Sequence, residues 1–290
     1  MKTLVLGGSG YIGSAVIERL MAHGHEPVAV IRPGSSKRAS LISRDIEVRE
    51  GEFSDLEALA ELITNDIDAV IDAANPNDWE LDAQAVHTLL KPLANSSRPF
   101  VYTSGVWVFP NTSGADEETP PDPIAINQGR PRVEEIVLRT PKIHGVVLRP
   151  GVVHGHNGGI PARLRDWARA AGIGRYVSDE HEPVWPMVHL DDLADLYVLA
   201  VSRAQASSIV HGISEPGVSV KELAQAADVA TGGVGAAEAW PIAEARKSLG
   251  DRFAEALALH QVVHSSAAAS LGWQPRERSA ILELREGSYA

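Results

Sequence analysis

The sequence contains no cysteine among its 290 residues. Disulfide bonds, thiolate metal sites and a thiol nucleophile are therefore excluded. No apolar run approaches the roughly 20 residues that a membrane-spanning helix requires. The first residues, MKTLVLGGSG, lead into glycines rather than into a signal-peptide cleavage pattern. We therefore expect a cytoplasmic protein with no membrane partner.

Positive charge is also scarce, because the formal net charge is −12. Such an acidic balance argues against a nucleic-acid backbone as a partner. The spacing of the histidines and acids does not indicate a metal site. The three consecutive acids DEE at 116–118 indicate a solvated loop. The sequence thus directs attention to a small-molecule substrate.

The first half of the chain alternates short β-branched runs with helical stretches at 11–23, 55–64, 79–95 and 127–139. This alternation predicts an α/β fold of the Rossmann type, a doubly wound parallel sheet covered by helices on both faces. We expect residues 1–155 to form a dinucleotide-binding domain to which 186–215 return. Residues 156–185 and 216–290 would then form a smaller substrate-binding lobe.

A glycine triplet follows the first predicted strand directly. Gly7, Gly10 and Gly13 are spaced three apart in GGSGYIG, and an amphipathic helix begins at once. Glycines at this spacing permit a tight turn and close approach of a pyrophosphate, which the helix N-terminus then binds through free N–H groups. The alternative is a glycine-rich turn with no ligand. The strand before and the helix after it favour a dinucleotide site.

The second predicted strand ends in basic residues and serines. NAD sites usually place an acidic residue here to bind the ribose 2′-hydroxyl. This chain has Arg32, Ser36 and Lys37 instead, and a guanidinium suits a 2′-phosphate. NADP(H) is therefore predicted in preference to NAD(H). The competing interpretation is a solvated basic loop.

With these residues in view, the chain resembles the short-chain dehydrogenase/reductases, in particular their extended epimerase/dehydratase branch. The resemblance rests on GGSGYIG at 7–13, DAVIDAA at 68–74, VVLRPGVVHG at 146–155 and PMVHLDDLADLYVLA at 186–200. It implies a homodimer and several cofactor contacts. The implied contacts are Tyr11 and Ile12 along the pyrophosphate, Glu52 and Phe53 near the adenine, Ala73 and Ala74 beside the cofactor, and Pro150 and Val152 flanking the nicotinamide.

The chain departs from this family at the segment DPIAINQGRPRVEE, residues 122–135. Members usually carry Tyr-x-x-x-Lys on this helix, followed four residues later by an acid. Aligning that acid with Glu134 puts Ile126 and Arg130 in the two slots, whereas aligning it with Glu135 gives Asn127 and Pro131. The usual Ser or Thr falls at Gly105, with Thr103 and Ser104 just upstream. The standard proton-transfer groups are therefore missing, and the chain resembles an atypical member.

Other residues could take the missing roles. Arg130 either holds the nicotinamide ribose or is an exposed helix residue paired with Glu134. His154 titrates near neutral pH and could supply a proton, and Thr103 is a weaker candidate. His189 is assigned to a helix start capped by Asp191 or Asp192. The predicted substrate pocket comprises Gly105, Trp107, Ile126, His154 and Trp185.

These observations predict an NADP(H)-dependent oxidoreductase acting on a small carbonyl or alcohol with a non-standard proton donor. A sugar-nucleotide epimerase or dehydratase is the alternative from the same branch. A non-catalytic protein that senses a dinucleotide is the alternative from another class. The sequence does not choose the substrate or the direction of the reaction.

Overall fold

The computed structural model describes residues 1–179, 181–276 and 278–290. Its centre is a seven-stranded sheet in which all neighbouring strands are parallel. In sheet order the strands are β11 (Ser208–Gly212), β7 (His144–Pro150), β5 (Pro99–Thr103), β4 (Ala69–Asp72), β1 (Lys2–Leu6), β2 (Glu26–Ile31) and β3 (Glu47–Glu50). The predicted Rossmann-type sheet is therefore confirmed.

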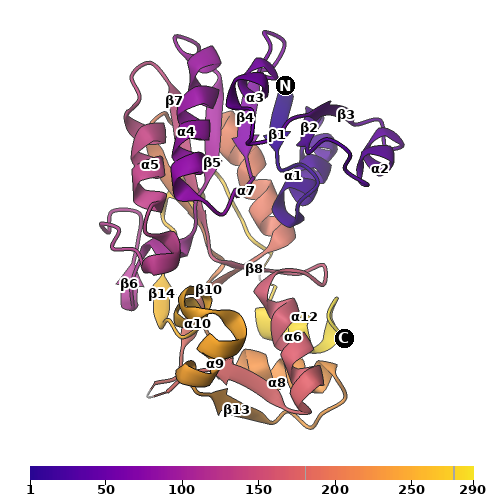
Figure 1. The fold of residues 1–290 in the computed structure, drawn as a ribbon, viewed down its shortest axis with the longest axis vertical. Helices are drawn as coiled ribbons and strands as arrows, with labels where there is room; N and C mark the ends of the chain where they lie inside the picture. Colours follow the sequence, from indigo (N-terminus) through magenta and orange to yellow (C-terminus); the bar gives the residue numbers. More distant parts are fainter. Residues whose placement is uncertain (180, 277) are drawn as a thin grey trace.

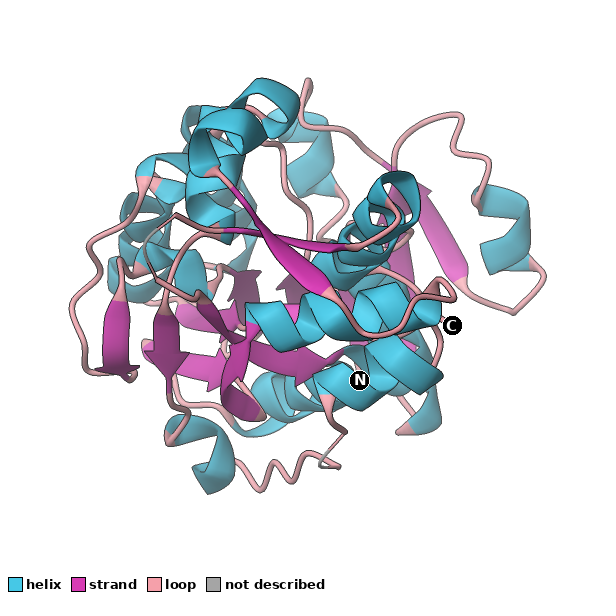
Figure 2. Cartoon of the chain, turned by 90° about the horizontal axis from the view of Figure 1, so that it is seen from below, coloured by secondary structure: helices cyan, strands magenta, loops and turns pink. Residues whose placement is uncertain are grey.

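Helices cover both faces of this sheet (Figures 1 and 2). On one face lie α1 (Tyr11–Ala22), α2 (Arg38–Ile42), α7 (Leu190–Arg203) and α11 (Ala267–Ser270). On the other face lie α3 (Leu56–Glu61), α4 (Trp79–Leu90) and α5 (Arg130–Arg139). Because both faces are buried, the central strands β1, β4 and β5 are mainly apolar, whereas the edge strand β3 is charged and only partly buried.

Side chains of the strands alternate between the two cores. Ile71 and Val101 belong to the core under α1 and α7. Val70, Phe100 and Tyr102 belong to the core under α4 and α5. This period of two fixes which residues at the strand ends face which helices, and it governs the site described below.

The rest of the chain builds a second lobe, drawn below the main sheet in Figure 1. Its small sheets are β12–β10–β8, β13–β9 and β14–β6. The strands are β6 (Thr112–Ala115), β8 (Val152–His154), β9 (Gly174–Val177), β10 (Val184–His189), β12 (Glu215–Ser219), β13 (Ala237–Trp240) and β14 (Gln261–Val263). The helices are α6 (Gly159–Ala171), α8 (Val220–Ala230), α9 (Ile242–Leu249), α10 (Asp251–Leu257) and α12 (Ala280–Glu286).

The chain passes between the two parts several times. After α6 and β9 it returns through β10 to α7 on the main sheet, and β11 then becomes the edge strand of that sheet. The described part of the chain also contains the short 3-10 helices η1 (Lys91–Leu93), η2 (Val106–Val108) and η3 (Ala125–Asn127). Among the residues that the structure describes, no helix combines the length and apolar character needed to cross a membrane.

Candidate functional site

The glycine loop between β1 and α1 has the geometry of a phosphate cradle. Gly7 has φ +71°, and its carbonyl accepts a hydrogen bond from the Gly10 N–H at 2.8 Å. A Cβ atom on Gly13 would lie 2.2 Å from the Gly7 carbonyl oxygen, so a side chain there would collide with backbone. The N-cap residue of α1 is Gly10, which leaves the first N–H groups without a side-chain cap. These residues fit the pyrophosphate of a dinucleotide.

The residues predicted for the adenosine end lie beyond the ends of β2, β3 and β4. Arg32, Ser36 and Lys37 are exposed after β2, where they are open to solvent. Their neighbour Arg38 is 3.4 Å from Glu50. The other predicted contacts follow β3 and β4, with Glu52 exposed and Phe53, Ala73 and Ala74 half-buried. Because the carboxyl ends of parallel strands meet at one edge of a sheet, all of them lie on the side where α/β proteins bind ligands.

A cavity of about 480 Å³ continues from the start of α1 to the second lobe. Eight of the predicted residues line it: Tyr11, Ile12, Gly105, Trp107, Ile126, Arg130, Pro150 and Val152. Sequence reasoning did not select its other polar and aromatic walls: Asn75, Asn77, Asp78, Trp79, Asp82, Gln128 and Arg252. The volume is within the range of a small-molecule site.

Helix α5 begins at Arg130, three residues later than the sequence predicted, and η3 precedes it. The Arg130 guanidinium donates hydrogen bonds to Asp82 at 3.3 Å and to the Thr103 carbonyl at 3.1 Å, and its third acceptor is the Tyr102 hydroxyl. Only 13% of its side chain is exposed. The interpretation of Arg130 as an exposed partner of Glu134 is therefore wrong. Glu134 instead forms a buried bidentate pair with Arg149 on β7.

Two residues with hydroxyl groups, Thr103 and Ser104, stand at the end of β5 and have different surroundings. Thr103 shares a hydrogen bond of 2.6 Å with the Tyr197 hydroxyl on α7, and it does not line the cavity. The next residue, Ser104, does line the cavity, and its buried hydroxyl has no hydrogen-bond partner among the described residues. At the end of β5 it is therefore Ser104 that borders the cavity, whereas the sequence favoured Thr103. The one-residue shift follows from the alternation along the strand.

Two buried carboxyl groups lie behind Arg130. Asp82, on α4, accepts a hydrogen bond of 2.6 Å from the Tyr102 hydroxyl. Burial raises the pKa of Asp82, although Arg130 and that hydrogen bond oppose the rise. Burial and repulsion from Asp82 raise the pKa of Asp72 to about 7, against the opposing Ala74 N–H and Arg130. Sequence reasoning did not select this cluster, although Asp72 is an acid inside the apolar run VIDAA.

Two predicted pocket residues lie away from the cavity, and their assignment to it was wrong. His154 is fully buried, and its ring packs edge-on against His189 with ring centroids 5.1 Å apart. Burial and His189 lower the pKa of His154 to about 3, so the ring is neutral at neutral pH. The protonated imidazolium that would act as a proton donor is therefore absent. Trp185 belongs to the core of the second lobe. Neither residue lines the cavity, to which β8 contributes Val152 and Val153.

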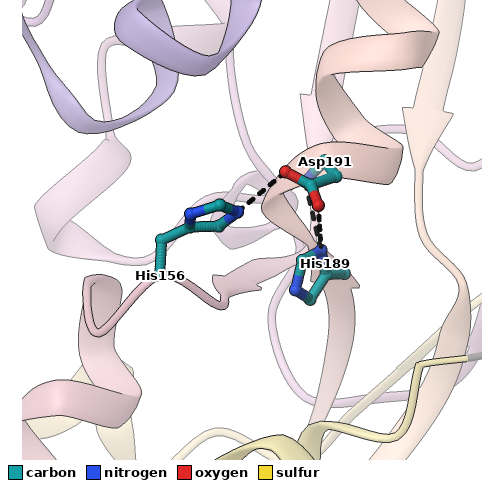
Figure 3. A group of neighbouring side chains, drawn as sticks. All are labelled: His156, His189 and Asp191. Atoms are coloured by element: carbon teal, nitrogen blue, oxygen red, sulfur yellow. Dashed lines mark hydrogen bonds and ion pairs between the residues drawn. The ribbon is translucent and has the colours of Figure 1, made fainter. Parts of the chain in front are cut away.

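A second polar cluster lies at the start of α7 (Figure 3). His189 is the N-cap of that helix, and its ring accepts from the Asp191 N–H at 3.2 Å, so the cap is the histidine and not Asp191 or Asp192. His156 is 2.8 Å from Asp191, and the three side chains are close enough to ligate a metal ion. The Arg278 guanidinium already lies 2.5 Å from Asp191 and 2.6 Å from His189. This cluster is therefore an ion-pair network with its cation in place.

Comparison with known proteins shows which family and which folds the chain resembles. The NAD dependent epimerase/dehydratase family matches residues 3–211. The uncharacterized protein C2A9.02 of Schizosaccharomyces pombe is 30% identical over 77% of this chain and 78% of its own. The human epimerase family protein SDR39U1, solved with NADPH, superposes with a TM-score of 0.80 at 22% identity over 99% of both chains. UDP-glucose 4-epimerase of Thermotoga maritima, solved with UDP-glucose, gives 0.79 at 20% identity over 100% of this chain and 97% of its own.

Members of this family are generally NAD(P)-dependent enzymes, and the cradle and cavity lie where such a cofactor binds in the Rossmann fold. The match covers well over half of the chain and includes the glycine loop, Asp82, Ser104 and Arg130. The chain belongs to the NAD dependent epimerase/dehydratase family.

Proposed function

We propose that the protein is an NADP(H)-dependent oxidoreductase that acts on a small carbonyl or alcohol. The observation that carries the proposal is the continuity of the site. One cavity connects the start of the phosphate-binding helix with an unpartnered Ser104 hydroxyl and with Arg130. Nicotinamide, when bound, supplies or accepts a hydride. The human relative solved with NADPH supports the same cofactor class.

The chain's own residues would divide the work as follows. Arg130 is held by Asp82, Tyr102 and the Thr103 carbonyl, so its remaining donors are presented in a fixed direction to ribose hydroxyls. The Ser104 hydroxyl can donate to the oxygen of a substrate carbonyl. Trp79 and Trp107 give the cavity flat apolar walls, and Asn75, Asn77 and Gln128 add amide donors and acceptors. Ile126 contributes an apolar surface where relatives usually have tyrosine.

The cofactor half of the proposal predicts a preference for NADPH over NADH that depends on Arg32. This guanidinium is exposed at the end of β2 and can reach a 2′-phosphate. Replacing Arg32 with alanine is expected to weaken NADPH binding about tenfold and leave NADH binding unchanged, because one charge-assisted hydrogen bond contributes about 1.5 kcal/mol. Titration calorimetry with both nucleotides measures this. Arg44→Ala, a surface change beside Glu18, is the matched control.

The catalytic half is tested by mixing the protein with NADPH and a panel of aldehydes, ketones and quinones and following NADPH absorbance. Turnover that is lost in Ser104→Ala, with NADPH affinity unchanged, supports the proposal. Absence of NADPH binding in the calorimeter would refute the cofactor assignment. NADPH binding without turnover of any compound, together with a stable protein partner, would favour the sensor function.

A sugar-nucleotide epimerase or dehydratase is the second candidate, and the superposition on UDP-glucose 4-epimerase favours it. Those enzymes begin by oxidising the sugar, a step for which the family's helix tyrosine takes the proton. Ile126 cannot take a proton, and this lowers the standing of the candidate. Tightly bound NAD that copurifies with the protein, together with conversion of a UDP- or dTDP-sugar, would establish it over the oxidoreductase.

A further inference from the structure

The proposed reduction requires one proton for each hydride, and Ile126 cannot provide it. The described residues that line the cavity include two with carboxyl groups, Asp78 and Asp82. Asp78 caps α4 by accepting from the Glu80 and Leu81 N–H groups, so its carboxylate is held as an acceptor. Asp82 differs, because one of its oxygens is buried and has no hydrogen-bond partner.

Asp82 belongs to a cluster drawn from four elements. Asp72 ends β4, Tyr102 lies on β5, Arg130 opens α5 and Asp82 projects from α4. Asp72 is 1% exposed, and one of its oxygens accepts a hydrogen bond from the Ala74 N–H at 3.1 Å. Its other oxygen has no partner among the described residues. Tyr197, from α7 on the opposite face, is the remaining titratable group near Asp72. Asp72 is the neighbour of Tyr102 in the adjacent strand, and Asp82 accepts from the Tyr102 hydroxyl. Two buried carboxyl groups therefore lie beside one tyrosine, and the Arg130 guanidinium is 3.3 Å from Asp82.

The balance of charges determines whether Asp72 and Asp82 are both ionised. With both carboxyl groups ionised, one positive charge would face two buried negative charges, and two of the oxygens would lack a donor. Such an arrangement is costly, and a pair of this kind retains a proton to higher pH than either acid alone.

We propose that Asp72 and Asp82 hold one proton between them and that Asp82 delivers it into the cavity during carbonyl reduction. The inference rests on the proposed function and names its proton donor. The hydride forms the new C–H bond, and the carbonyl π electrons move to oxygen. The oxygen then takes the proton from Asp82, whose new negative charge lies beside Arg130. A proton from solvent restores the pair after the alcohol leaves. Asp82 is the catalytic residue, and Asp72 is a positioning residue that raises the proton affinity of the pair.

Infrared spectroscopy of the free protein tests the stored proton without any cofactor. Ordinary carboxyl groups are ionised at about pH 6, so a protonated C=O stretch there reports carboxyl groups of raised pKa. The band is expected to disappear by about pH 8.5 and to be lost or strongly reduced in both Asp72→Asn and Asp82→Asn. Glu215, half-buried and also raised in pKa by burial, provides the control. Glu215→Gln should not change the part of the C=O band that comes from Asp72 and Asp82. A band unaffected by both Asp variants would overturn the proposal.

Delivery is tested with NADPH and 9,10-phenanthrenequinone, a small and unspecific carbonyl acceptor. Reduction by the unaltered protein should slow as pH rises through about 7, and Asp82→Asn should lower kcat at least roughly tenfold. Asp72→Asn should shift or remove the pH dependence, which a merely structural role would not do. An unchanged pH profile in Asp72→Asn, or no turnover of the quinone by protein that binds NADPH, counts against the proposal. Loss of NADPH binding in the unaltered protein would instead refute the proposed function.

Discussion

Gly13→Ala is expected to lower affinity for NADPH at least roughly 100-fold, equivalent to about 2.7 kcal/mol of binding free energy. The smallest possible side chain is sufficient, because its Cβ would lie 2.2 Å from the Gly7 carbonyl oxygen and 2.8 Å from the Gly7 carbonyl carbon. Backbone cannot move aside as the end of a flexible side chain can. The loop must therefore open, and the N–H groups that face the phosphates lose their alignment. Titration calorimetry with NADPH measures the loss.

Gly114→Ala is the matched control for this prediction. Gly114 lies in β6 far from the cradle, and a Cβ there would meet no atom within 4 Å. Circular dichroism should show the same secondary structure in both variants, which separates a damaged loop from a damaged fold. A folded Gly13→Ala protein that binds NADPH like the unaltered one would contradict the assignment of this loop to the pyrophosphate.

The parts of the fold with strong local signals were predictable from sequence. Glycine spacing, buried apolar runs and helix periodicity each depend on neighbours close in the chain, so they predicted the sheet, α1 and the position of the cradle. The start of α5 was less accessible. Residues 127–129 fit a helical pattern, but Gly129 packs against the Trp79 ring, and the regular helix begins only at Arg130. That contact joins residues 50 positions apart, so the sequence around Gly129 does not indicate it.

Some of the side chains that line the cavity were likewise predictable from the sequence, and others were not. Gly105 and Ile126 were located by their place in the family pattern, and Trp107 was selected as an aromatic residue that could stack on a ligand. Asp82 was not, because it lies in the first turn of a helix, where acids are common and usually face solvent. Asp72 is an acid in an apolar run, but only the folded sheet shows that it neighbours Tyr102, whose hydroxyl donates to Asp82. His154 was misplaced because a three-residue strand gives no reliable indication of which face its side chains occupy.

Arg149→Leu is expected to cost about 3–5 kcal/mol of unfolding free energy, the usual effect of leaving one member of a buried ion pair alone. The Arg149 and Glu134 side chains are only 1% and 3% exposed. Arg149 also lies over the Phe109 ring at 5.2 Å and close to His211, so its removal affects packing as well as charge. Urea denaturation measures the change. Arg139→Ala breaks an exposed pair with Glu135 on the same helix and should cost only about 0.5 kcal/mol.

The double variant Glu134→Leu/Arg149→Leu distinguishes the charge effect from the packing effect. Removing both charges abolishes the unpaired buried carboxylate, so the double variant should recover most of the stability that Arg149→Leu loses. The pair also joins α5 to β7, the two elements that bring Arg130 and Pro150 to the cavity. NADPH affinity should therefore fall in Arg149→Leu and recover in the double variant if the pair acts only by holding these elements together. The double variant could instead recover its free energy of unfolding while its affinity for NADPH stays low. In that case the directional hydrogen bonds of the Arg149 guanidinium set the position of α5, and the buried pair specifies geometry as well as stability.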